Sequence, residues 1–63
     1  MEWYSERDSQ GYEAFRAYDS GRVAEVYKRG VTWIASVSMP DGRNLRNQFG
    51  SRKAAQHWVE RQE

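Results

Sequence analysis

The segment 31-VTWIASVSMPDGRNLRNQF-49 carries the clearest structural signal in this chain. Apolar residues occupy alternate positions in its first half: Val31, Trp33, Ala35, Val37 and Met39. This period of two predicts a strand with one buried face. A turn is expected at 40-PDGR-43, because proline fixes φ and glycine accepts a positive φ. Leu45 and Phe49 alternate with polar residues after the turn, so we predict a returning strand and an antiparallel hairpin.

Two segments upstream extend the predicted sheet. The segment 22-RVAEVYK-28 alternates and is rich in β-forming residues, so we expect a third strand. The segment 12-YEAFRAY-18 allows two interpretations, a strand joined by the turn 19-DSG-21 or a short helix capped by Ser9. The glycine in the turn favours the strand. Residues 1–11 are mainly polar, and we expect them to be loose.

Residues 51–62 are predicted to form a helix. Ser51 precedes helix-forming residues and is a good N-cap. The apolar stripe of this helix consists of Ala54, Ala55, Trp58, Val59 and Gln62. We expect the stripe to pack on the apolar strand face, with Trp58 filling the gap. The predicted fold class is α+β: one small domain over residues 1–63, in which a three- or four-stranded antiparallel β-meander (22–49, with 12–18 as the open fourth strand) packs on one C-terminal helix.

Composition excludes several classes of chemistry. The 63 residues contain no cysteine, so we expect no disulfide and no thiolate metal ligand. His57 is the one histidine and the carboxylates are scattered, so no catalytic pair or zinc site can be assigned, and we expect a non-enzyme without a cofactor. No apolar run approaches the roughly 20 residues of a membrane span. We therefore expect a cytoplasmic protein that does not bind membranes.

Charge is unevenly distributed along the chain. Residues 1–20 contain two Arg and five Asp or Glu, whereas residues 21–63 contain eight Lys or Arg and four Asp or Glu. The overall charge of +1 conceals this asymmetry. A basic C-terminal part indicates an anionic partner, although such a difference also arises by chance in a short chain.

The polar side of the predicted sheet is a candidate nucleic-acid surface. By alternation it contains Tyr27, Thr32, Ile34, Ser36, Arg46 and Gln48. Hydroxyl, amide and guanidinium groups can hydrogen-bond phosphate oxygens and base edges. Arg43 at the hairpin tip adds a cation. Arg52 and Lys53 stand at the helix start, where they and the backbone N–H groups could hold a phosphate. The alternative is an ordinary solvated sheet face with two solvated cations beside it.

The spacing of these residues resembles a known family. The series Val26, Trp33-Ile34-Ala35-Ser36-Val37, Asp41-Gly42-Arg43, Phe49-Gly50-Ser51, Ala54-Ala55 and Trp58 is similar to the AP2-like, arm-type DNA-binding domain of phage and transposon integrases. That family has three strands and a C-terminal helix and lays its sheet into the major groove. The resemblance implies that Thr32, Ile34, Ser36, Arg46 and Gln48 face DNA. This chain departs from the family in being less basic and in having an acidic first segment.

Two functions of different classes follow from the sequence. The leading prediction is a small accessory protein of phage or mobile-element type that binds double-stranded DNA through the sheet face. The alternative is a protein-binding module or inhibitor whose interface is the acidic, aromatic first segment, with Trp3, Tyr4, Tyr12, Phe15 and Tyr18. A homodimer formed through a sheet edge is a third possibility, because a short sheet leaves its edges unprotected.

Overall fold

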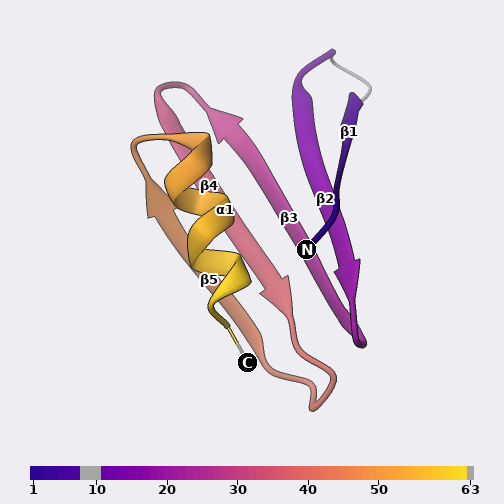
Figure 1. Ribbon diagram of the computed structural model, residues 1–63. Coiled ribbons are helices and arrows are strands. Elements are labelled where there is room, and N and C mark those ends of the chain that lie inside the picture. The colour runs from indigo at the N-terminus through magenta and orange to yellow at the C-terminus, as the bar shows by residue number, and fades with distance from the viewer. Residues whose placement is uncertain (8–10, 63) are drawn as a thin grey trace.

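A five-stranded antiparallel sheet and one helix form the described part of the protein, residues 1–7 and 11–62 of a computed structural model (Figure 1). The elements in chain order are β1 (Trp3–Arg7), β2 (Glu13–Asp19), β3 (Arg22–Arg29), β4 (Thr32–Ser38), β5 (Asn44–Phe49) and α1 (Arg52–Glu60). Each strand pairs antiparallel with the next, so the order in the sheet is the order in the chain. The predicted α+β meander with a C-terminal helix is confirmed, with five strands rather than three or four.

The N-terminal segment contains the additional strands. Residues 13–19 form β2, which decides the open choice between strand and helix in favour of the strand. The expectation that residues 1–11 are loose is wrong for Trp3–Arg7, which pairs with β2 from Trp3↔Ala17 to Arg7↔Glu13. An edge strand is held by backbone pairing and buries few side chains. The mainly polar sequence of β1 therefore did not indicate a strand. Ser9, the alternative helix cap, lies outside the described residues.

Short turns connect the strands and set their register. Ser20 and Gly21 both have positive φ, 51° and 83°, as a two-residue type I′ hairpin turn requires. A Cβ on Gly21 would lie 3.2 Å from the Cβ of Pro40, so the glycine also permits close approach of the next hairpin loop. Val31 was predicted to share the apolar strand face, but it lies in the β3–β4 turn and is 86% exposed.

One face of the sheet, the inner face, packs against the helix. Alternate residues of each strand point toward it, as the pairs Ala17↔Ala24, Ala24↔Val37 and Val37↔Leu45 show. The buried core consists of Phe15, Ala17, Ala24, Val26, Ala35, Val37, Met39, Ala55 and Val59, with Trp3, Trp33, Leu45, Phe49 and Trp58 packed around it. The predicted apolar strand face from Trp33 to Phe49 is therefore confirmed.

Helix α1 lies across the inner face over β3, β4 and β5, and its backbone does not approach β1 or β2 (Figure 1). The side-chain oxygen of Ser51 accepts a hydrogen bond from the Ala54 N–H at 3.2 Å, which confirms the N-cap. Trp58 packs on Phe49 with ring centroids 5.9 Å apart. Ala54 is exposed, contrary to the predicted stripe, whereas the adjacent Ala55 is fully buried. No helix in the described part of the chain has the length and hydropathy needed to cross a membrane.

Candidate nucleic-acid interface

The face opposite the helix, the outer face, brings together the six sheet residues predicted from alternation. Strand register places Tyr27 opposite Ile34 and Ile34 opposite Gln48, and it places Ser36 opposite Arg46. Thr32 lies two residues before Ile34 on the same face of β4. The helix occupies the other side of the sheet, so no described secondary-structure element covers these residues (Figure 1).

Tyr27 is the centre of a cationic cluster on this face. Its hydroxyl accepts a hydrogen bond from Nη2 of Arg46 at 3.0 Å, across the intervening strand β4. The guanidinium carbon of Arg29 lies 5.6 Å from the centroid of its ring, within cation–π range. Neither arginine forms an ion pair with a described carboxylate. Two guanidinium groups therefore meet at Tyr27, one over its ring and one at its hydroxyl, without a carboxylate partner among the described residues.

Ile34 lies beneath this cluster and not on its surface. The side chain is only 5% exposed, although it points to the outer face. Tyr27 is its direct cross-strand neighbour, and the Arg46–Tyr27 bond joins the two strands that flank it. Little of the Ile34 side chain is therefore accessible to a partner, whereas Arg29 and Arg46 are exposed.

The part of the outer face nearer β1 is acidic, in contrast to the cationic cluster around Tyr27. Arg16 lies between two carboxylates, 3.3 Å from Glu6 and 3.0 Å from Glu25. A hydrogen bond that Arg16 donates to the Tyr18 hydroxyl oxygen, followed by these two carboxylates, raises the pKa of Arg16. We call Glu6, Arg16 and Glu25 the acidic half, and Tyr27, Arg29, Thr32, Ser36, Arg46 and Gln48 the basic half. The acidic half has two carboxylates for one guanidinium, and the basic half has two guanidiniums and no carboxylate.

Arg43 lies at the tip of the β4–β5 hairpin, as predicted, and is engaged with Asp41. Its Nε lies 2.7 Å from one carboxylate oxygen, and its backbone N–H donates to the other at 3.0 Å. The backbone hydrogen bond from Arg43 is the main reason that the pKa of Asp41 is lowered from 3.8. A phosphate contact by Arg43 would therefore compete with this carboxylate.

Arg52 and Lys53 belong to the helix layer and are not brought together with the outer face. The guanidinium carbon of Arg52 lies 4.6 Å from the centroid of the Phe15 ring. Because the helix backbone does not approach β2, Phe15 would be more exposed without this side chain. Packing on Phe15 thus explains why a cation stands at the positive end of the helix, where the helix dipole disfavours it. Lys53 is exposed, and its predicted phosphate contact stays a prediction.

The aromatic residues of the first segment divide between the two faces. Trp3 packs against the core and donates a hydrogen bond from Nε1 to Glu60 at 3.2 Å, and Phe15 is buried on the inner face. Tyr4 and Tyr18 point to the outer face and are 53% and 58% exposed. The protein interface predicted from five neighbouring aromatics is therefore not one contiguous surface.

Arg29 is the member of the basic half that the sequence analysis missed. The predicted strand ends at Lys28, although Glu25, Tyr27 and Arg29 already have period-two spacing. Strand β3 continues through Arg29, which pairs with Thr32 next to a two-residue turn. Extending the alternation to the last residue before the glycine would have found it.

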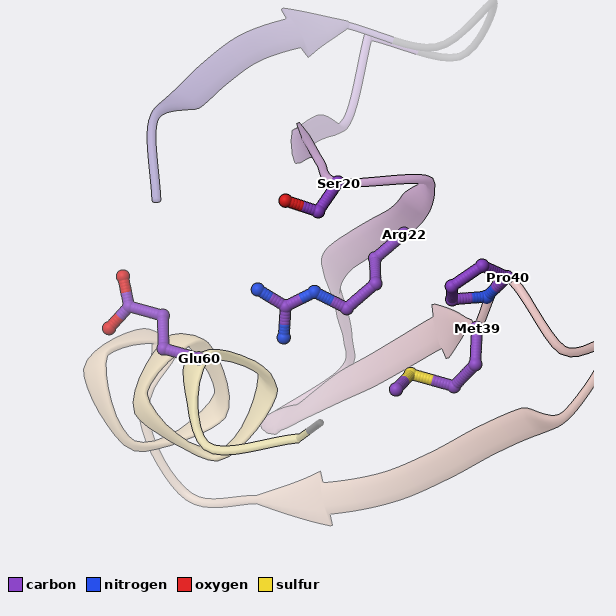
Figure 2. Close-up of a pocket in the computed structure, with 5 residues that line it drawn as sticks. All are labelled: Ser20, Arg22, Met39, Pro40 and Glu60. Carbon is purple, nitrogen blue, oxygen red and sulfur yellow. The ribbon is translucent and has the colours of Figure 1, made fainter.

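A separate pocket lies on the helix side of the sheet, at the C-terminal end of α1 (Figure 2). It is lined by Ser20, Arg22, Met39, Pro40 and Glu60 and has a volume of about 320 Å³. Arg22 extends from β3 toward the helix end, where it donates to the backbone oxygen of Gln62 and, at 2.7 Å, to Asp19. These bonds fasten the helix end to the β2–β3 turn. We assign the pocket a structural role, because the guanidinium of Arg22 is already bonded to protein acceptors.

Replacing Arg22 with alanine is expected to lower the free energy of unfolding by about 1–3 kcal/mol, because its side chain is only 14% exposed and its charged hydrogen bond to the helix end is lost. Arg22 is also the main cause of the lowered pKa of Asp19, whose ordinary value is 3.8. The ion pair therefore stabilises the fold above pH 3.8 and ceases to do so as pH falls through the lower folded-state pKa. Urea unfolding between about pH 2 and 7 measures both effects.

Arg43→Ala is the matched control, because its partner Asp41 also has a lowered pKa but the pair is exposed at a loop tip. We expect a small stability change for this variant. Equal losses for the two variants would contradict the assigned role of Arg22.

Among the described residues, no group of three His, Asp or Glu side chains could hold a metal ion. Comparisons of the chain with protein-family models, with curated proteins and with solved structures find no match. The integrase-like resemblance therefore depends on the quoted residues alone. The geometry of the basic half is the independent ground for assigning a function.

Proposed function

We propose that this protein is a small, non-enzymatic, cytoplasmic DNA-binding protein that contacts double-stranded DNA with the basic half of its outer face. The observation that supports this is the pairing of Arg29 and Arg46 on Tyr27, on a sheet face that the helix leaves open and without a carboxylate partner in the described part of the chain. A phage or mobile-element setting follows from the resemblance and is part of the same proposal.

Phosphate binding explains the cationic cluster chemically. Arg46 uses one N–H on Tyr27 and has further donors in the same planar group, so it can bind a phosphate or a guanine edge without breaking that bond. The Tyr27 ring restricts the motion of the Arg29 guanidinium, which reduces the entropy lost on binding. The cluster is therefore preorganised for an anion.

Residues on β4 and β5 supply the uncharged contacts. Ser36, opposite Arg46, and Gln48, next along β5, offer a hydroxyl and an amide that can hydrogen-bond base edges or sugar oxygens. Glu6 and Glu25 repel phosphate on the other half of the sheet. We therefore place the DNA over β4, β5 and the Tyr27–Arg29 end of β3, away from Glu25, β1 and β2.

Salt dependence of binding to random duplex DNA tests the proposal. We expect a dissociation constant of about 1–100 μM at low salt, with a log–log salt slope of about two to three, because each displaced counterion contributes about 0.9. Fluorescence anisotropy with a labelled duplex measures both quantities. Absence of binding at about 50 mM salt, or binding without salt dependence, would refute the proposal.

The alternative, a protein-binding module, is supported by a different surface. Tyr4, Tyr18 and Val23 are exposed on the outer face, Val23 to 44%, and Tyr18 and Val23 are direct cross-strand neighbours. Exposed aromatics beside charged residues are common anchors of protein interfaces. If duplex DNA does not bind, Tyr18→Ala is the first variant to test for loss of a protein partner.

A further inference from the structure

The two edges of the sheet differ in whether their backbone groups are protected. On β5, the side chain of Asn47 accepts a hydrogen bond from the Gln48 N–H at 2.8 Å, so this N–H is no longer available to another strand. On β1, no described side chain bonds to a backbone group of Trp3–Arg7. Unprotected edges are templates for strand addition. The β1 edge is therefore the more open of the two.

The sequence of β1, 3-WYSER-7, is complementary to itself when two copies run antiparallel about Ser5. In that register, Trp3 lies opposite Arg7 of the second copy, and Tyr4 lies opposite Glu6 of the second copy. The first pair is on the inner face and the second on the outer face, as the pairing of β1 with β2 requires. In the inner pair the Arg7 guanidinium meets the Trp3 indole ring, and in the outer pair the Tyr4 hydroxyl meets the Glu6 carboxylate.

The two neighbouring registers that keep the faces aligned bring like charges together. An axis at Glu6 places this carboxylate opposite its own copy, and an axis at Tyr4 places Glu2 opposite Glu6. Like charges directly opposite each other destabilise a strand pair. Charge complementarity therefore favours the axis at Ser5 over these two registers.

We propose that two copies of this chain associate through antiparallel pairing of their β1 strands about a two-fold axis at Ser5, which joins the two sheets into one. Because the helix lies over β3–β5, it does not obstruct this edge (Figure 1). Five residues of strand per copy bury less than the roughly 1,200 Å² of a standard interface, so the dimer is weak and forms at about 100 μM or above. The association does not depend on DNA binding.

Sedimentation velocity without DNA tests the dimer. Between about 10 μM and 1 mM, we expect the mean mass to rise from 7.4 kDa toward twice that value. Ser5→Lys should abolish the rise, because it places two ammonium groups directly opposite each other at the axis. The fold of each copy should persist, because Glu13 lies within reach of the new cation. Gln48→Lys on the β5 edge is the matched control and should leave the rise unchanged. A constant 7.4 kDa, or loss of the dimer in the Gln48 variant alone, would overturn the proposal.

Cross-linking gives a second, geometric test. The chain has no cysteine, so Ser5→Cys introduces a single thiol that the axis places opposite its own copy. Oxidation should produce a disulfide-linked dimer several-fold faster than for Gln48→Cys. Equal rates for the two variants would show that the β1 edge is not the site of association.

Discussion

Ala55→Leu is expected to lower the free energy of unfolding by about 1–3 kcal/mol. Ala55 is fully buried between the helix and the sheet, where Ala24 and Ala35 are also fully buried. Small side chains on both surfaces let the helix approach the strands closely, so an isobutyl group has no space and must displace the helix. A 63-residue domain has a total stability of only roughly 3–9 kcal/mol, so the loss is a large fraction of it.

Ala54→Leu is the matched control because Ala54 precedes the same site in the helix and is exposed. We expect a change within about 0.5 kcal/mol, since both residues favour helices and no packing is altered. Thermal unfolding followed by circular dichroism distinguishes the two, with an expected decrease in Tm of roughly 5–20 °C for the Ala55 variant. Equal effects would mean that close approach of the helix is not the constraint.

The double variant Arg29→Ala/Arg46→Ala is expected to weaken DNA binding by about 10- to 100-fold at low salt and to reduce the salt slope by about two. The physical reason is the loss of both cations of the basic half. Neither side chain belongs to the buried core, so the fold should persist. Anisotropy titrations at several salt concentrations, with circular dichroism as a check of folding, measure the effect.

Arg52→Ala/Lys53→Ala is the control for net charge because it also removes two cations, but from the helix layer. If the outer face binds DNA, this variant should lose only a few-fold in affinity through long-range electrostatics. A larger loss than for the sheet variant would move the interface to the helix start. A Tm measurement is needed beside it, since Arg52 covers the Phe15 ring.

The candidate interface could be predicted only in part from the sequence. Period-two alternation placed Tyr27, Ser36, Arg46 and Gln48 on one face, because a strand has fixed side-chain geometry. The same argument could not show that the Ile34 side chain is buried, since Tyr27 and Arg46, which are bonded to each other, lie on the two strands that flank it. Contacts across strands depend on register and rotamers, which alternation does not specify.

The β-meander, its turns and the capped helix could be predicted from the residues alone. These features are local: the alternation of residues 33–49, the glycine turns and the Ser51 cap act within a few residues of chain. Three features required the folded structure: Trp3–Arg7 joins the sheet, Arg52 covers Phe15, and Arg29 and Arg46 meet at Tyr27. These contacts join residues that are distant in sequence, or they depend on which face of the sheet the helix covers. Packing of the whole core selects them, and local sequence patterns do not specify it.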